Sequence, residues 1–539
     1  MNGPLAATES AYQDTRYFAD QLDVTTASGR DTNAHGVSIA ELRTGYTDAR
    51  ARLLAGLALV DSTSLDPDDL RAYRLIQATT TRSLGADPAP AVDAGEAGGD
   101  GETVSCTYDA SALLATNGED AIVARIFACY GYAALDVRLD DEHLDRLTVF
   151  GLMATTDDSV RRRRLFAALE PIWQAVNGDD GPDSPWRLVQ RRRADRWKAA
   201  DGEYPHLRRA ARLGIPGDSV ESWLVAALEA WRDVQPEGLI EPWDWYYRNG
   251  EADRHLSSRI PRDSLLAINH AFYRSLGADP VALGVQYDVE PRADKYPIAY
   301  TTFGARPQQR ASGGGWWPGE PWVFAAYRTG GLGNLSELLH ETGHAVHIAA
   351  IRTRPAYASW PDSDTFTEAI AELAGLDLYE PRWQMAFLGD SVSLEVSLRA
   401  KYGSAMLDLA WALFEIRMGK DPEASPNVVW SGITSEYLRI KPHPEWSWWA
   451  MRGQLIESPG YMLNYALGAL LVAQIRDGVR AARDTPSDPS AGDPEWYAWV
   501  SDRLYRFGLE TPTSEVLLEF LGGPMSPAAL LADLSRVLH

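Results

Sequence analysis

Cysteine is almost absent from this sequence. Only two cysteines, Cys106 and Cys129, occur among the 539 residues, which excludes a disulfide-dense scaffold and a cysteine-rich metal site. We expect both to be free thiols in a reducing compartment, with a single disulfide as the alternative.

Long apolar segments are also missing. The most apolar run, residues 461–475, is shorter than the roughly 20 residues that a membrane-spanning helix needs, and it contains Asn464 and Gln474. The N-terminal segment lacks the basic stretch and apolar stretch of a secretory signal. We therefore expect a soluble, cytoplasmic protein that has no membrane partner.

Positive charge is scarce relative to negative charge. The chain has 51 Lys and Arg against 75 Asp and Glu, for a formal net charge of −24. A surface this acidic repels phosphates, which argues against nucleic acid as a partner. It could favour cationic peptides or amines, although solubility explains the charge more simply.

Residues 340–344 read His-Glu-Thr-Gly-His, the most informative short pattern in the chain. His340 and His344 lie one turn apart on one face of a helix, so both imidazoles can reach a single zinc ion. Glu341 is turned toward the same ion and can take a proton from a zinc-bound water. The pattern is the H-E-x-x-H arrangement of a metallopeptidase. A surface helix with two histidines is the alternative for the bare pattern.

The flanking residues favour the metal site. Asn334 and Glu337 fit a capping box, which predicts that the helix begins at this point. Leu335, Leu338 and Leu339 provide apolar faces that would bury the helix. Buried polar side chains need partners, and a metal ion would be one.

A third ligand must come from another segment. A metzincin would have glycine and histidine where this chain has His347 and Ala350, so that class is excluded. Residues 364–379 are typical of a following helix, on which Glu368 and Glu372 lie one turn apart on one face. We assign Glu368 as the third ligand and Glu372 as the acceptor of a hydrogen bond from a ligating histidine. Two solvated glutamates on an amphipathic helix are the alternative.

Three segments resemble one family of peptidases. Residues 340–347 are similar to the H-E-x-G-H-x-x-H signature of the thimet oligopeptidase and oligoendopeptidase F family of gluzincin zinc metallopeptidases. Residues 366–372 are similar to the F-x-E-A-I-x-D segment of angiotensin-converting enzyme, a relative with the same helical fold. Residues 459–468 resemble the P-F-Y-x-Y-x-Y-A-x-G segment of oligoendopeptidases. This last resemblance implies that Tyr465 donates a hydrogen bond to the developing oxyanion and that Tyr461 contacts substrate.

One position departs from that family. Its members usually carry a histidine about five residues before the position of Tyr461, where this chain has Ile456. His443 could supply the missing donor from another loop, as a Lys-x-His segment does in angiotensin-converting enzyme. A loop histidine between two prolines is the alternative. The departure leaves the zinc chemistry intact and puts the substrate in question.

The rest of the chain predicts the fold. Apolar residues recur with helical spacing near residues 36–60, 66–83, 118–134, 141–153, 157–176, 184–200 and 217–235. Residues 296–304 and 322–328 are typical of short strands. We predict a mostly α fold with a small β-sheet beside the zinc-binding helix. Because the chain is too long for one compact core, two helical lobes should flank a deep cleft: an N-terminal lobe (1–250) and a catalytic lobe (251–539).

Taken together, these features predict a Zn²⁺-dependent metallopeptidase acting on short peptides, as a monomer or homodimer. His340, His344 and Glu368 would hold the metal, Glu341 would be the general base, and Tyr465 would hold the oxyanion. One alternative is a zinc hydrolase of a small non-peptide amide in a biosynthetic pathway. Another is a binding protein without catalysis, against which the intact ligand set counts.

Overall fold

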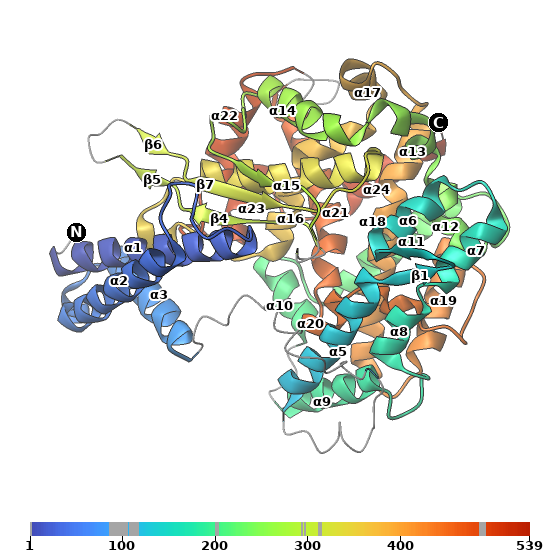
Figure 1. Cartoon of the computed structure of the whole chain (residues 1–539), viewed down its shortest axis with the longest axis horizontal. Coiled ribbons are helices and arrows are strands. Elements are labelled where there is room, and N and C mark those ends of the chain that lie inside the picture. The colour runs from blue at the N-terminus through green and yellow to red at the C-terminus, as the bar shows by residue number, and fades with distance from the viewer. Residues whose placement is uncertain are drawn as a thin grey trace.

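Helices make up most of the structure, and the sheets are small (Figure 1). The computed structural model describes residues 3–85, 106, 118–199, 204–292, 295, 298–310, 315–483 and 492–538. The predicted mostly α class is therefore confirmed. The two lobes, the deep cleft and the division at residue 250 stay predictions. Within the described ranges, no helix is both long and apolar enough to cross a bilayer.

The helices fall before and after a central sheet region. Those before it are α1 (Gly3–Ala27), α2 (Ile39–Leu59), α3 (Pro67–Gly85), α5 (Glu119–Leu135), α6 (Arg146–Thr155), α7 (Ser159–Ala167), α8 (Glu170–Asn177), α9 (Pro185–Ala199), α10 (Pro205–Arg212), α11 (Ser219–Asp233), α12 (Pro242–Asn249), α13 (Glu251–Leu256) and α14 (Leu265–Ser275). Those after it are α15 (Leu332–Ala350), α16 (Asp364–Gly375), α17 (Pro381–Leu388), α18 (Leu394–Lys420), α19 (Pro426–Leu438), α20 (Gln454–Glu457), α21 (Met462–Arg483), α22 (Trp496–Val500), α23 (Thr513–Leu521) and α24 (Ala528–Ser535).

The central sheet has three strands in the order β3 (Gln286–Asp288), β7 (Glu320–Phe324) and β4 (Tyr300–Ala305). β3 is parallel to β7 and β4 is antiparallel to it, so β4 is an edge strand. Both β4 and β7 contact α15, as predicted for a small sheet beside that helix. The described residues also contain two pairs of short antiparallel strands, β1 (Val137–Leu139) with β2 (Glu142–Leu144) and β5 (Gln308–Gln309) with β6 (Trp316–Trp317).

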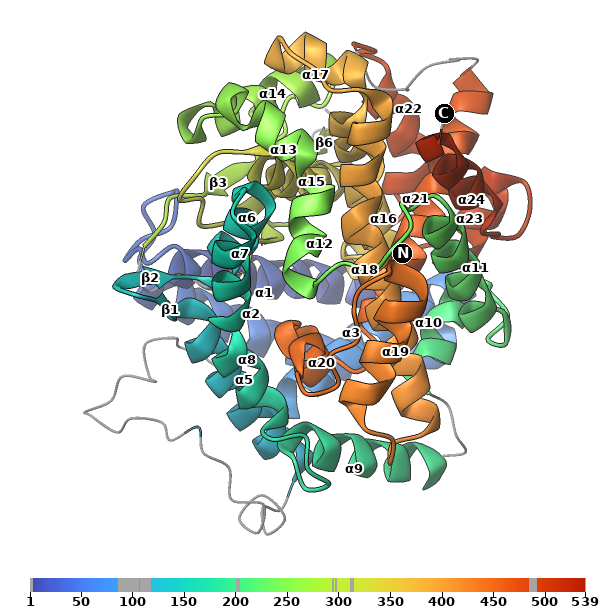
Figure 2. The same ribbon diagram turned by 90° about the vertical axis from the view of Figure 1, so that its right-hand side faces the viewer.

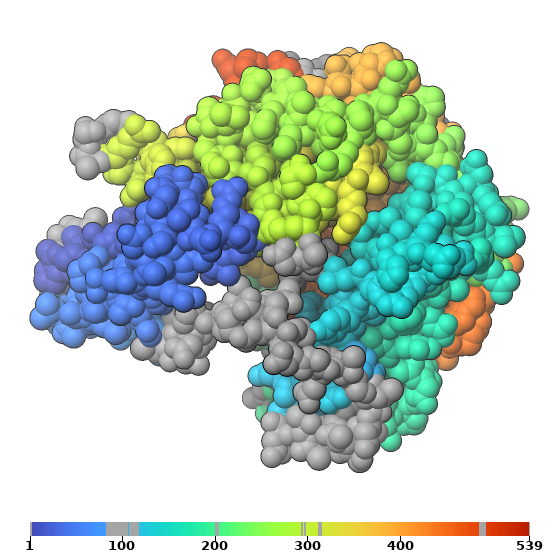
Figure 3. Space-filling model, viewed as in Figure 1, coloured from blue at the N-terminus to red at the C-terminus, as the bar shows by residue number. Residues whose placement is uncertain are grey.

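The N-terminal helices α1 to α3 (blue) form a group that packs beside this sheet through α1. α1 packs against α2 and against β4, and on the face in Figure 3 the group's surface adjoins that of the sheet region. Arg354 fastens the group through ion pairs with Glu9 and Asp69. Apolar periodicity did not reveal α1, because its buried face carries polar residues such as Glu9, Asp20 and Gln21.

Two of the predicted helices are wrong in part. Residues 142–144 form strand β2 rather than the start of a helix, and the helix begins only after Asp145, whose side chain caps it by accepting from the Thr148 amide. The helix predicted over 157–176 is two helices, α7 and α8. Pro171 lies in the first turn of α8, and proline is tolerated at a helix start but not in a helix interior.

Four helices of the second half form the support of the candidate site. α16 packs against both α15 and α21, and α21 also packs against α18 (Figure 2). Their facing sides belong to one apolar core that includes residues from Ile122 to Val537. The site therefore lies on helices that are held on several sides.

The expectation of two free thiols is wrong. Cys106 and Cys129 form a disulfide, with Cα atoms 5.7 Å apart. The two residues are 23 positions apart in the chain. The sequence spacing alone therefore did not show that the two sulfurs meet in the folded chain.

Candidate metal centre

The centre is built where α15 and α16 approach each other closely. At Gly343, a Cβ atom would lie 2.2 Å from the backbone oxygen of Ala371, far inside contact distance. Only glycine leaves room for the two backbones at this point. Because Glu368 lies about one turn before Ala371, the close approach places its carboxylate next to His340 and His344.

α15 does not begin as predicted. It starts at Leu332, and the Leu332 amide donates to Asp253 Oδ1 at 2.6 Å. Asn334 is already inside the first turn, where its side chain donates to the Thr329 and Gly330 carbonyls. The capping box of Asn334 and Glu337 is therefore wrong, because the cap comes from Asp253, far away in sequence.

The three predicted ligands converge. His340 Nε2 lies 3.4 Å from Glu368 Oε2, and His344 Nε2 lies 3.9 Å from the same oxygen. One ligand atom from each residue fits within 4.8 Å of the others. Two ligands that each lie about 2.1 Å from a tetrahedral zinc ion are about 3.4 Å apart. The spacing, the burial and the two imidazoles with one carboxylate therefore fit zinc.

A second glutamate orients one of the histidines. Glu372 Oε1 lies 3.0 Å from His340 Nδ1, which leaves Nε2 of that ring facing the centre. His344 has no matching support: its Nδ1 is buried without a hydrogen-bond partner among the described residues. Of the two histidines of α15, only His340 is oriented by a hydrogen bond to its second ring nitrogen. Glu372 makes the contact with a ligating histidine that was predicted for it.

The charges of the centre follow from burial and from these contacts. Burial lowers the pKa of His340, but hydrogen bonds to Glu368 and Glu372 outweigh it and hold that pKa well above its usual value. Burial and the neighbouring His340 lower the pKa of His344 to about 3. For Glu368, burial raises the pKa, but the hydrogen bond to His340 and the two imidazoles bring it below its usual value. The carboxylate is therefore held ionised, as a metal ligand must be.

Glu341 is buried next to the sheet. Its Oε2 accepts a hydrogen bond from Thr301 Oγ1 at 2.6 Å, and the same hydroxyl lies 2.9 Å from the Glu341 carbonyl. Burial raises the pKa of Glu341 to about 7, a value suited to taking up and releasing a proton near neutral pH. Thr301 was not predicted, because the sequence places a strand at residues 296–304 beside the helix but does not show which of its side chains faces Glu341.

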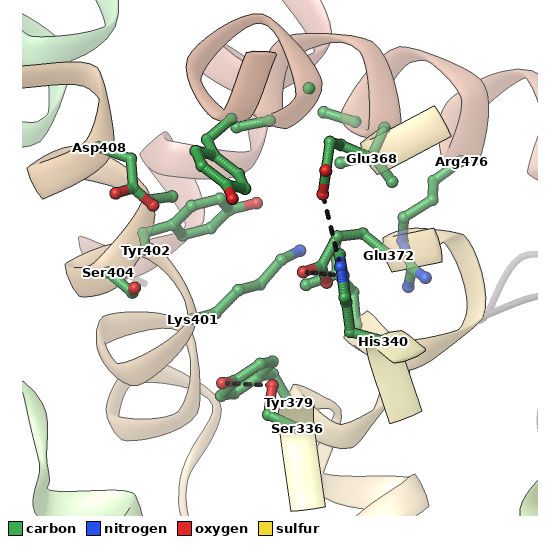
Figure 4. A pocket seen from close by; sticks show the side chains of 17 residues that line it. Ser336, His340, Glu368, Glu372, Tyr379, Lys401, Tyr402, Ser404, Asp408 and Arg476 are labelled. Atoms are coloured by element: carbon green, nitrogen blue, oxygen red, sulfur yellow. Dashed lines mark hydrogen bonds and ion pairs between the residues drawn. The ribbon is translucent and has the colours of Figure 1, made fainter. Parts of the chain in front are cut away.

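Both predicted tyrosines lie at the centre. Tyr461 donates to Glu368 Oε1 at 3.3 Å, and the rings of Tyr461 and Tyr465 are 5.6 Å apart. Tyr465 lines a cavity of about 170 Å³ together with His340 and Glu368 (Figure 4). Burial raises the pKa of Tyr465, so its phenol keeps its proton and can donate it in a hydrogen bond.

A buried carboxylate holds the segment that carries these tyrosines. Glu415 of α18 accepts from the Gly460 amide at 2.7 Å and from the Met462 amide at 3.0 Å. These amides flank Tyr461 at the start of α21. Glu415 was not predicted, because it reads in sequence as one charged position on a long helix.

His443 and Ile456 lie apart from the centre. The two ring nitrogens of His443 contact Glu241 and Glu445, at 2.9 and 2.7 Å, and its ring stacks on Trp446. None of these residues lines the cavity of Figure 4. Ile456 is fully buried in the apolar core. The structure thus brings together every predicted site residue except His443.

Comparison with known proteins identifies the fold. No family model and no curated protein matches this chain. A protein assigned as an oligoendopeptidase F matches in structure with a TM-score of 0.57 and 16% identity, covering 98% of this chain and 96% of that chain. Metallocarboxypeptidase 1 of Trypanosoma cruzi matches with a TM-score of 0.55 and 15% identity, covering 99% of both chains. PZ peptidase A, in a structure with an inhibitor, matches with a TM-score of 0.56 and 14% identity, covering 99% of this chain and 95% of that one. The predicted resemblance is therefore confirmed at the level of the fold, and this chain has a metallopeptidase fold.

Proposed function

We propose that this chain is a zinc-dependent metallopeptidase that hydrolyses peptide bonds of oligopeptides. The observation that carries the proposal is the convergence of His340, His344 and Glu368 beside a buried Glu341. A buried carboxyl next to a three-residue ligand set is the arrangement that metal-assisted hydrolysis needs, with a general base beside the metal.

Each residue has a role that its contacts support. His340, His344 and Glu368 would hold zinc, which supplies an activated water and polarises the scissile carbonyl when bound. Glu341 would accept the proton of the attacking water and pass it to the leaving amine, while Thr301 holds its carboxylate in place. Tyr465 would donate to the oxyanion.

We infer that the substrate backbone binds along β4, beside these groups. β4 is an edge strand, and an extended peptide can add to such an edge through main-chain hydrogen bonds. Thr301 of β4 contacts Glu341 directly. A peptide paired with β4 would therefore pass close to the general base.

The test is a comparison of wild type with Glu341→Gln. An amide cannot accept the proton, so the variant should retain one equivalent of zinc, measured by mass spectrometry, and lose cleavage of a mixed peptide library. Glu395→Gln, at an exposed glutamate paired with Arg399 on α18, is the control and should cleave like wild type. Absence of zinc from the wild type would refute the proposal. Zinc without any cleaved peptide would favour a small non-peptide amide as the substrate instead.

A further inference from the structure

The cavity beside the metal centre has a second wall that the proposed chemistry does not use. Helix α18 contributes Lys401, Tyr402 and Asp408 to the same cavity that His340 and Glu372 line. In Figure 4 the Lys401 side chain extends from α18 across the cavity toward the pair formed by His340 and Glu372. A cationic group thus faces the cavity from the wall opposite the zinc-binding helix.

Lys401 is buried, and its hydrogen-bonding capacity is not filled. Its side chain is only 5% exposed, and Nζ lies 3.6 Å from Asp533 Oδ2. That distance is an ion pair but not a hydrogen bond. An ammonium has three donors, and within the described ranges no hydrogen bond from this one is seen. The Asp533 carboxylate is itself shared with Tyr402 and Arg536.

The other charged groups of the cavity are already engaged. Glu372 and Glu368 contact His340, and Asp408 pairs with Arg452. Arg476 pairs with Asp377 at 2.7 Å. Lys401 is held by its 3.6 Å ion pair with Asp533 and by the Tyr402 ring, whose centroid lies 4.7 Å from Nζ. Unlike the other charges, it keeps hydrogen-bond donors for an incoming group, and an ammonium binds an anionic acceptor more strongly than a neutral one.

We propose that Lys401 forms a carboxylate-binding subsite of this cavity, beside the metal centre. This inference rests on the proposed peptidase function. The ligand is a carboxylate of the peptide substrate, either its C-terminus or the side chain of an aspartate or glutamate. A cavity of about 170 Å³ admits such a group on a short chain, since a single water needs only about 10–15 Å³ of this space.

The test measures binding separately from turnover. The first pair of probes is N-acetylated penta-alanine with a free C-terminal carboxylate and the same peptide with a C-terminal amide. Each further pair has the C-terminal amide and carries either glutamate or glutamine at one position, taken in turn. Calorimetry on zinc-loaded Glu341→Gln protein should show roughly tenfold tighter binding of the carboxylate member of at least one pair. Adding Lys401→Met should bring the two members of that pair to equal affinity. The pair that responds identifies the source of the carboxylate.

A matched control separates charge in the cavity from charge in general. Lys420 lies at the exposed end of the same helix and pairs with Glu221. Lys420→Met should leave the ratio of the two binding affinities within each probe pair unchanged. Asp533 retains Tyr402 and Arg536 after loss of Lys401, so folding should survive, and a thermal melt checks this. Equal or undetectable binding of both members in every pair would overturn the subsite.

The two proposals can fail separately. Cleavage of library peptides by wild type without any preference for a carboxylate would overturn the subsite and leave the peptidase standing. A carboxylate preference that depends on Lys401, without cleavage of any peptide, would support the subsite and count against the peptidase.

Discussion

Removing Glu372 should weaken zinc binding without changing the ligands themselves. Glu372 is the acceptor for His340 Nδ1 at 3.0 Å, and it holds the ring with Nε2 toward the centre. His344 has no such partner within the described ranges, so support of the imidazoles depends on this single contact. Glu372→Ala removes it, whereas Glu372→Gln keeps an oxygen that can accept.

The structure sets the size of the effect. Loss of such a supporting contact typically weakens metal affinity by about 10- to 100-fold, which is about 1.4 to 2.8 kcal/mol. The Glu372 side chain is 37% exposed, and solvent screens a contact of this kind. We therefore expect a loss of about tenfold for the alanine variant and a smaller loss for the glutamine variant.

The assay is an equilibrium competition for zinc between the protein and a fluorescent chelator. Wild type, Glu372→Gln and Glu372→Ala should rank in that order of affinity. Equal affinity for all three would refute the idea that Glu372 orients His340. A glutamine variant as weak as the alanine variant would show that the charge, rather than the accepted hydrogen bond, is what matters.

Three further perturbations test other parts of the centre. Tyr465→Phe should lower kcat by about 10²–10³-fold with zinc content unchanged, and full activity would exclude it as an oxyanion donor. Gly343→Ala should lower the thermal midpoint and zinc content together, because its Cβ would meet the Ala371 oxygen at 2.2 Å; a variant as stable as wild type would contradict the close helix contact. Burial raises the pKa of Glu415 from 4.5 to about 7, so its contribution to stability is full below about pH 4.5 and is lost as pH rises through 7. The thermal midpoint of wild type should therefore fall relative to that of Glu415→Gln between about pH 5 and about pH 8, and a constant difference would argue against burial of this carboxyl.

Local sequence patterns predicted much of the helical fold. Helical spacing is a short-range property, so α2, α3, α5, α9 and α11 lie close to where apolar periodicity places them. Apolar periodicity missed α1, because many of the residues that this helix buries are polar. It also failed just before the capping residue Asp145, because the three residues of β2, Glu142–Leu144, are too few to show the alternation of a strand.

For the site, the chain by itself determined which residues share a helix face. The four-residue spacing of His340 with His344, and of Glu368 with Glu372, places each pair on one side of a helix whatever the rest of the fold. Only the tertiary structure decided that the two faces meet at Gly343, that Asp253 caps α15 and that Thr301 holds Glu341. The same holds for Lys401, which reads as an ordinary charged position until α18 packs beside the centre. Spacing along one helix is decided by the backbone geometry of a few residues, whereas contacts between helices depend on packing across the whole core.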